Sequence, residues 1–249
     1  EAREEVPVQP EDADGRELKG ILARGGVATT GATEIGGIRT IVKTRVIAER
    51  QQVVRVDWEN EFELAGKPAD GFCRRLEAEV GKSTGVIIED YGKGVIQQKV
   101  VDSVLKAARA KDIPVGLDPK ENHELALGGI TVATPNRKEA FAIAGVGERP
   151  VHPNPLHDKA LLKVAGILMK KWSPALLLIT LGPLGILLVT KNAAPKHVPT
   201  RAREVFDVSG AGDTVIATCV LALAAGANPF ESAELANYAA GVVVGKLGP

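Results

Sequence analysis

A chain of 249 residues can bury one large core, and 45% apolar with 25% charged residues is an ordinary balance for a globular protein. Lysine plus arginine and aspartate plus glutamate each number 31, so the net charge of zero gives no reason to expect nucleic acid or an anionic membrane as a partner. The longest apolar stretch, Ala175–Val189, is interrupted by Gly182-Pro183 and is too short to span a bilayer.

The N-terminus and the cysteines indicate where the protein works. Residues Glu1–Glu5 are mostly acidic and lack the apolar core of a signal peptide. Cys73 and Cys219 are far apart and have no metal-ligand spacing. Cys219 lies in an apolar run, so we expect a buried free thiol rather than a disulfide. A soluble protein in the reducing cytoplasm fits these features.

The first third of the chain predicts a short helix and a β-ribbon. Up to about Ala13 the sequence is polar and weakly patterned, and Arg16–Ala23 predicts a helix before the Gly25-Gly26 turn. Ile38–Ala48 and Gln51–Asp57 then alternate β-forming and polar residues. We expect these two segments to pair as a ribbon that carries basic side chains.

From Gly85 onward, strand patterns alternate with helix patterns. The strands are predicted at Gly85–Asp90, Ile113–Leu117, Ile130–Ala133 and Ala175–Thr180, and the helices around Val101–Ala108, Leu161–Lys171, Gly212–Ala225 and Pro229–Lys246. Gly185–Thr190 either pairs with the strand before it or lies at a sheet edge. This order predicts an α/β fold with a mostly parallel sheet covered by helices on both faces. Polar residues follow the strand ends, where such sheets bind ligands.

The run Gly210–Thr214 at a predicted helix start is the strongest chemical signal. Small residues let the backbone approach an anion, and the unpaired N–H groups of a first helical turn point at it. Asp213 is out of place in a phosphate cradle unless it accepts a proton from an attacking hydroxyl. A glycine turn with Asp213 as a cap is an equally good interpretation of the spacing alone.

The whole run Asp207–Thr214 resembles the C-terminal signature of the ribokinase-like (PfkB) carbohydrate kinases. The resemblance implies a single ribokinase-like domain over residues 1–249, a three-layer α/β sandwich with a small β lid at residues 38–57. It implies ATP and Mg²⁺ as cofactors. It further implies that the backbone of Gly210, Ala211 and Gly212 forms an anion hole and that Asp213 is the catalytic base.

Other segments agree with this family. Asn136-Arg137-Lys138-Glu139 resembles its Asn-x-x-Glu motif, which organises Mg²⁺ and the ATP phosphates through Asn136 and Glu139. A carboxamide and a carboxylate at this spacing suit a hydrated Mg²⁺, although the same pair more often forms a helix cap. Thr180–Gly185, with Gly182 between, resembles the nucleotide-binding turn, and Asn237 falls where the last helix lines the adenine site.

A narrower resemblance, to the heptose 7-phosphate kinase subgroup, covers most of the chain from about Glu11. It rests on segments 43–48, 51–57, 90–94, 118–120 and 240–248. It implies a sugar phosphate as substrate, with Asp90 at the sugar hydroxyls and Lys93 at phosphate or sugar. The ribbon residues Lys43, Arg45, Arg50 and Arg55 would bind the substrate phosphate, although a solvated hairpin face explains some of them as well. Lys120 would face the ATP phosphates or form a structural ion pair.

The chain departs from the family near its start. The family's first strand, which ends in a sugar-binding Asp, and its Gly-Gly motif followed by Ala and Asn are absent, and Gly25-Gly26 is an ordinary turn. We expect that residues are missing from the sequence rather than lost in nature. The alternatives are another PfkB-type sugar or sugar-phosphate kinase and a non-catalytic nucleotide-binding relative. A homodimer, and a nucleotidyltransferase fused or separate, are the partners that the resemblance allows.

Overall fold

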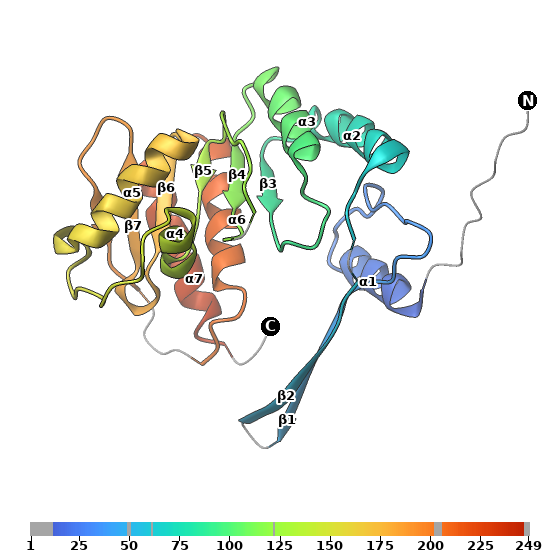
Figure 1. Cartoon of the computed structure of the whole chain (residues 1–249), viewed down its shortest axis with the longest axis horizontal. Coiled ribbons are helices and arrows are strands. Elements are labelled where there is room, and N and C mark those ends of the chain that lie inside the picture. The colour runs from blue at the N-terminus through green and yellow to red at the C-terminus, as the bar shows by residue number, and fades with distance from the viewer. Residues whose placement is uncertain (1–11, 49–50, 61, 122, 202–205, 247–249) are drawn as a thin grey trace, which may run out of the picture.

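The computed structural model describes residues 12–48, 51–60, 62–121, 123–201 and 206–246, and these form a layered α/β body with a projecting ribbon (Figure 1). The six strands of the main sheet lie side by side in chain order. They are β3 (Val86–Glu89), β4 (Val115–Asp118), β5 (Val132–Ala133), β6 (Leu176–Thr180), β7 (Ile186–Thr190) and β8 (Lys196–Val198). Strands β3 to β6 are parallel, β7 runs antiparallel to β6, and β8 runs antiparallel to β7.

Helices cover both faces of this sheet, which confirms the predicted three layers. The described helices are α1 (Ala13–Arg24), α2 (Gly66–Val80), α3 (Gln98–Arg109), α4 (Arg137–Ile143), α5 (Lys159–Trp172), α6 (Ala211–Ala224) and α7 (Pro229–Val243), of which α1 buries no residue and lies apart from the sheet (Figure 1). Helices α3, α4 and α5 share one apolar core with the sheet, and α6 with α7 shares the other. Short 3-10 turns lie at Pro155–His157 and Gly182–Leu184. In the part of the chain that is described, no helix is both long and apolar enough to cross a bilayer.

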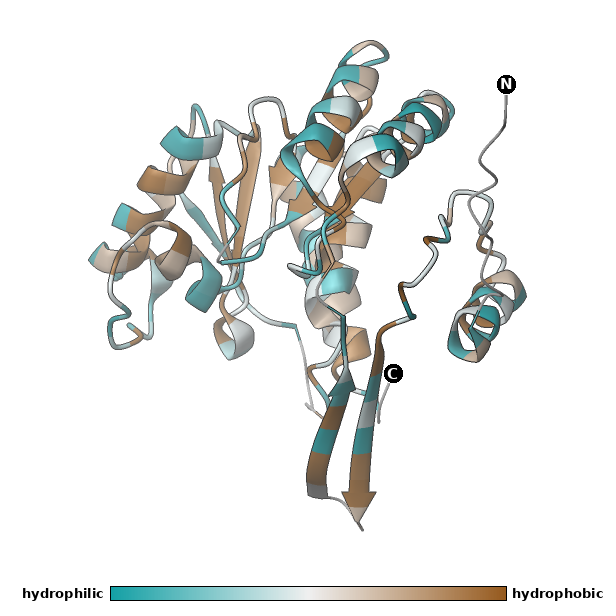
Figure 2. Cartoon of the chain, turned by 45° about the vertical axis from the view of Figure 1, so that its right-hand side comes forward, coloured by the Kyte–Doolittle hydropathy of each residue, from teal (hydrophilic) through white to brown (hydrophobic). Residues whose placement is uncertain are grey.

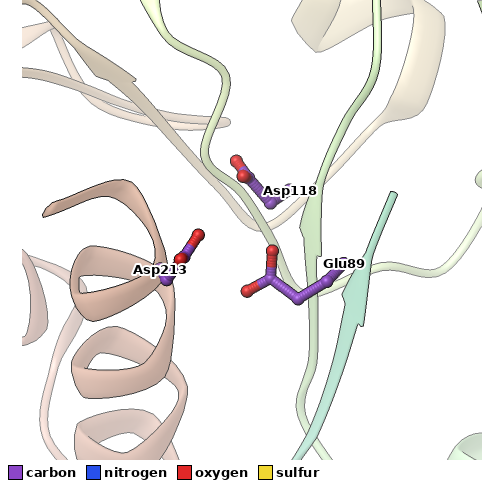
Figure 3. A group of neighbouring side chains, drawn as sticks. All are labelled: Glu89, Asp118 and Asp213. Carbon is purple, nitrogen blue, oxygen red and sulfur yellow. The ribbon is translucent and has the colours of Figure 1, made fainter. Parts of the chain in front are cut away.

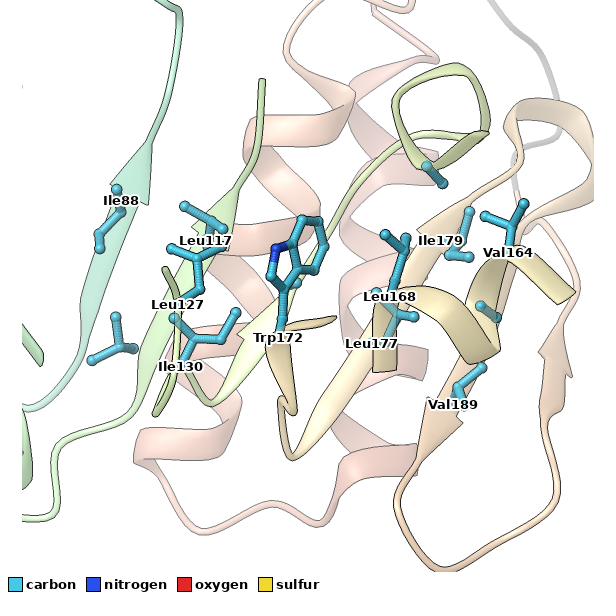
Figure 4. Packing of buried hydrophobic residues seen from close by; sticks show 14 of the residues in the cluster. Ile88, Leu117, Leu127, Ile130, Val164, Leu168, Trp172, Leu177, Ile179 and Val189 are labelled. Carbon is cyan, nitrogen blue, oxygen red and sulfur yellow. The ribbon is translucent and has the colours of Figure 1, made fainter. Parts of the chain in front are cut away.

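Strand β6 shows how the two cores form from one sheet. Because successive side chains of a strand point to opposite faces, Leu177 and Ile179 join the core under α5, whereas Leu176 and Leu178 join the core under α6 and α7. Trp172, at the end of α5, packs into the first of these cores (Figure 4). All four β6 side chains are at most 1% exposed, and each such burial contributes about 1.5–3 kcal/mol. Figure 2 shows the apolar residues gathered along these central strands.

Helix α6 lies unusually close to the sheet because β4 carries a glycine beneath it. A Cβ at Gly116 would lie 2.5 Å from Val220 Cγ2 and 3.1 Å from Ile216 Cγ1. A Cβ at Gly85, just before β3, would likewise lie 2.9 Å from Val220. The glycines therefore allow α6 to pack onto β3 and β4, and they set the depth at which its first turn meets the carboxyl ends of those strands.

The predicted ribbon is confirmed as a separate two-stranded antiparallel sheet of β1 (Val42–Ala48) and β2 (Gln51–Trp58). Its first strand begins at Val42, later than predicted, and Glu49 and Arg50, between the two predicted strands, lie outside the described residues. The ribbon projects from the body (Figure 1) and exposes apolar side chains, among them Ile47 and Val53.

Two local predictions are settled by the pairing and the burial, and one helix is new. The strand at Gly185–Thr190 pairs with β6 along its whole length, and the sheet edge is the additional strand β8. Both cysteines are buried free thiols, as predicted for Cys219. Helix α2 was not predicted.

Candidate active site

The first turn of helix α6 has backbone N–H groups without an acceptor in the part of the chain that the structure describes. Its N-cap is Gly210, which has a left-handed φ of +74° and no side chain to cap the helix. The N–H of Ala211 closes a turn by donating to Val208 O at 3.2 Å. Within the described residues the N–H groups of Gly212 and Asp213 have no acceptor. This is the arrangement that binds anions at helix N-termini, and the anion hole predicted at Gly210, Ala211 and Gly212 stays a prediction.

Three carboxylates from separate elements converge in front of this turn. Glu89 ends β3, Asp118 ends β4, and Asp213 lies in the first turn of α6, with oxygens of all three within 4.8 Å of one another (Figure 3). Burial, followed by the charges of its two neighbours, raises the pKa of Glu89 to about 7. Burial, with the charge of Glu139, raises the pKa of Asp118 to about 6. The cluster is therefore a strongly negative spot beside an anion-binding turn, and it favours a cation or a shared proton.

The loop after β3 holds a tyrosine against the predicted base. The Tyr91 hydroxyl donates to Asp213 Oδ1 at 3.2 Å. The buried Asp90 shapes this loop, because its Oδ1 accepts from the Gly92 N–H at 2.8 Å and its Oδ2 lies 2.6 Å from His123 Nδ1. Binding of sugar hydroxyls by Asp90 stays a prediction. No sequence pattern assigned a role to His123 or to Tyr91.

The Asn-x-x-Glu segment forms a reciprocal cap at the start of α4. Asn136 Oδ1 accepts from the Glu139 N–H at 3.0 Å, and Glu139 Oε2 accepts from the Asn136 N–H at 2.9 Å. Burial is the main cause that raises the pKa of Glu139. Asn136 also forms an isolated parallel bridge with Thr180, so two segments predicted to bind the nucleotide lie side by side. The capping geometry is compatible with a metal role, because each cap uses one oxygen, Oδ1 of Asn136 or Oε2 of Glu139. The other carboxylate oxygen of Glu139 is not used by the cap.

The two basic residues of this segment point to acidic partners. Arg137 Nη1 lies 3.0 Å from Asp158 Oδ2, and its guanidinium lies 4.5 Å from the centre of the Phe141 ring. Lys138 Nζ lies 3.8 Å from Glu121 Oε1. Both contacts are structural, and nucleotide binding by Arg137 and Lys138 stays a prediction.

A mainly apolar pocket opens between the turn after β6 and the two C-terminal helices. Four predicted nucleotide-binding residues line it: Thr180, Gly182, Gly185 and Asn237. The other lining residues are mostly small or aliphatic: Pro183, Ile186, Thr200, Val208, Ala211, Gly212, Val215, Ala240, Gly241 and Val244. Since Ala211 and Gly212 belong to both the pocket and the anion-binding turn, a flat apolar base bound here would point its phosphates at α6.

The predicted substrate-binding cations lie in different places, and two of them meet at the foot of the ribbon. Glu59, just after β2, accepts ion pairs from Lys43 and Lys93, and hydrogen bonds from those two lysines lower its pKa to about 2. Arg45 lies on the exposed face of β1, and its charge contributes to the lowered pKa of Asp207, whose main cause is the hydrogen bond from the Ser209 N–H. The charge of Lys120 acts on Asp118 and Glu139. Of the predicted ribbon cations, Arg45 is the one whose charge reaches Asp207, just before the anion-binding turn.

The sequence matches the description "pfkB family carbohydrate kinase" over residues 10–249. Its curated relatives include the bifunctional protein HldE of Pelobacter propionicus, 41% identical over 239 residues, and that of Trichlorobacter lovleyi, 42% identical over 239 residues. Each comparison covers 96% of this chain and 47% of the relative, so the chain spans about half the length of the curated relatives it matches.

Solved structures share the fold. Arabidopsis thaliana ribokinase, complexed with ribose and ATP, superposes with a TM-score of 0.71 at 20% identity, over 96% of this chain and 74% of its own. Escherichia coli phosphofructokinase-2, in complex with potassium, gives a TM-score of 0.71 at 18% identity, over 96% of this chain and 74% of its own. At such identities the likeness shows the fold alone. Together with the family match along nearly the whole sequence, it places the chain in the pfkB family of carbohydrate kinases, enzymes that transfer phosphate from ATP to sugars.

Proposed function

We propose that the chain transfers the γ-phosphoryl group of ATP to the anomeric hydroxyl of D-glycero-D-manno-heptose 7-phosphate, giving the 1,7-bisphosphate for ADP-heptose and lipopolysaccharide core synthesis. The observation that carries the chemistry is the position of Asp213, between the unpaired N–H groups of α6 and the carboxyl ends of β3 and β4. The substrate is supported by the identity of 41–42% to HldE proteins and by the basic ribbon.

In this reaction Asp213 takes the proton of the acceptor hydroxyl while the hydroxyl oxygen of the sugar bonds to the γ-phosphorus. The bond between the γ-phosphorus and the oxygen that bridges it to the β-phosphate breaks, and ADP is released. The Gly212 and Asp213 N–H groups stabilise negative charge on the transferred group. The pocket beside Asn237 binds the adenine. Lys43, Arg45 and Lys93 attract the 7-phosphate.

Mg²⁺ is the metal that accompanies ATP in this proposal. The residues present fit a hard cation, because carboxylate and carboxamide oxygens gather at the carboxyl edge of the sheet. Asn136, Glu139 and Asp118 would hold the ion, which would neutralise charge on the phosphates when bound. The caps between Asn136 and Glu139 fix both side chains for that task.

The base assignment is tested by replacing Asp213 with a neutral isostere. We expect Asp213→Asn to lower kcat by about 10²- to 10⁴-fold while ATP binding measured by calorimetry stays close to wild type. Asp102→Asn, the same chemical change on α3, is the control and should leave kcat unchanged. Near-normal turnover by Asp213→Asn would remove Asp213 as the base.

The substrate is tested by assaying ADP release with heptose 7-phosphate, fructose, ribose and tagatose 6-phosphate. We expect the highest kcat/KM with the heptose. Preference for another sugar would make the chain a different PfkB-type kinase. Binding of ATP without binding of any sugar, measured by calorimetry, would instead favour a non-catalytic nucleotide-binding protein.

Two partners belong to the proposal. A nucleotidyltransferase, fused or separate, is supported by the word "bifunctional" in the names of the relatives. A homodimer is supported by the apolar side chains that the ribbon exposes, among them Ile47, Val53 and Trp58. Light scattering of the purified protein measures the second directly.

A further inference from the structure

Asp213 lies in an environment that repels its charge. Carboxylate oxygens of Glu89 and Asp118 lie within 4.8 Å of a carboxylate oxygen of Asp213. The N-cap of α6 is Gly210, which makes no side-chain capping hydrogen bond. Like charges at this distance favour rotation of the exposed Asp213 side chain away from the strands and into solvent. A proton acceptor that rotates freely meets its substrate in the productive orientation only part of the time.

Tyr91 is the side chain that opposes this rotation. Its hydroxyl donates to Asp213 Oδ1 at 3.2 Å. Within the described residues, no other side chain donates a hydrogen bond to the Asp213 carboxylate. The phenol is a neutral donor, so it attracts the carboxylate without binding the transferred phosphate as a lysine would. Burial and the nearby carboxylates raise the pKa of Tyr91 to about 12, so it keeps its proton throughout the working range.

The loop that carries Tyr91 is held at several points. Asp90 is 7% exposed, accepts from the Gly92 N–H, and contacts His123. Gly94 has a φ of +84°, and a Cβ there would lie 1.5 Å from Phe62 O, so the backbone of the segment after the ribbon lies directly on this loop. Leu64 N–H donates to Gly94 O at 2.8 Å. Tyr91 is therefore presented from a fixed loop, although its own ring is exposed.

We infer that Tyr91 is a positioning residue for the phosphoryl transfer, holding the Asp213 carboxylate toward the acceptor hydroxyl against the repulsion of Glu89 and Asp118. The inference rests on the proposed function, since it assigns Tyr91 to the same reaction. Tyr91 itself neither gains nor loses a proton in the step. It leaves one Asp213 oxygen, Oδ2, to accept the proton of the sugar.

The test is Tyr91→Phe, which removes the hydroxyl and keeps the ring. A hydrogen bond to a charged group is worth enough to predict a fall in kcat of about 10- to 100-fold, with the KM for ATP within about threefold of wild type. The KM for the sugar should change little as well, because the lost hydroxyl contacts the base and not the bound sugar. A purely structural role of Tyr91 would instead raise KM or lower the free energy of unfolding along with kcat.

The chain supplies a matched control, because its other tyrosine is Tyr238, which is exposed on α7. Tyr238→Phe should leave kcat and both KM values unchanged. A Tyr91→Phe protein with kcat within twofold of wild type, or with a loss confined to KM, overturns the inference while the wild-type kinase activity stands. A wild-type protein that phosphorylates no sugar overturns the proposed function and this inference together.

Discussion

Glu89 lies at the end of β3 with its carboxylate among those of Asp118 and Asp213, and burial together with these charges raises its pKa to about 7 from an ordinary value of 4.5. A carboxyl group whose pKa is raised by folding favours the folded state when it is protonated. Its contribution is therefore complete below the unfolded pKa and is lost as the pH rises through about 7. Near neutral pH the site consequently opposes the stability of the fold.

Glu89→Gln should relieve this opposition. After discounting for solvent screening, we expect the variant to be about 1 kcal/mol more stable than wild type at about pH 8, or roughly 2–4 °C in Tm, and equal to it at about pH 4. Thermal unfolding at the two pH values measures the difference. Glu148→Gln, on an exposed loop, should show no such dependence. A Glu89→Gln protein that is less stable at the higher pH would mean that Glu89 makes a favourable contact there.

The sequence predicted Asp213 but not the environment in which it works. The glycine–alanine–glycine pattern before Asp213 is local, so a single segment carries the signal. Glu89 and Asp118 belong to strands 29 positions apart, and only the parallel pairing of Glu89 with Asp118 brings them together. Tyr91 reaches Asp213 across 122 positions of sequence. Such contacts follow from the packing of α6 on the sheet, which no local pattern encodes.

At the scale of the elements, the position of Asp213 depends on how deeply α6 packs. Gly116 in β4 lies under Val220 and Ile216, and a Cβ there would come within 2.5 Å of Val220. A methyl group at this point must push α6 outward, because neighbouring backbone and side chains fill the core at crystal-like density.

We therefore expect Gly116→Ala to destabilise the protein by about 1–3 kcal/mol and to lower kcat, because the first turn of α6 moves with the helix. Denaturant unfolding and steady-state kinetics measure the two effects. Gly166→Ala in α5 is the matched control, since a Cβ at Gly166 meets nothing within 4 Å. It should be neutral or stabilising, because alanine favours helix over glycine. Equal behaviour of the two variants would contradict the close packing of α6.

The elements that the sequence missed carry weak local signals. Helix α2 buries Ala69, Cys73 and Val80 at helical spacing, but it begins at Gly66 without a side-chain cap, so nothing in the sequence marks its start. Strand β8 has three residues, of which Val198 alone is buried. The strands β3, β4 and β6 were predicted within one or two residues, because their continuous apolar runs are typical of strands buried on both faces.

At the scale of the molecule the net charge is zero, but lysines and acidic residues lie close together at the foot of the ribbon. Lys43 from β1 and Lys93 from the loop after β3 both contact Glu59, and Lys43 also lies 3.5 Å from Asp57 Oδ2. Glu59 thus links the ribbon to the body. It also occupies two of the cations that the proposed function assigns to the substrate phosphate.

A substrate phosphate and the Glu59 carboxylate should therefore compete for Lys43 and Lys93. We expect Glu59→Gln to lower the KM for heptose 7-phosphate, because Lys43 and Lys93 lose the carboxylate that competes with the substrate phosphate. This KM should also depend more steeply on salt, because salt screens the attraction between the lysines and the phosphate. The KM for an unphosphorylated sugar should stay unchanged. Glu79→Gln is the control, because it removes an exposed carboxylate of α2 that pairs with Lys82. It should change neither of the two KM values. A higher KM for the phosphorylated sugar would show that anchoring the ribbon matters more than releasing its lysines. In that case Glu59 would support the phosphate site by holding Lys43 and Lys93 together rather than by competing for them.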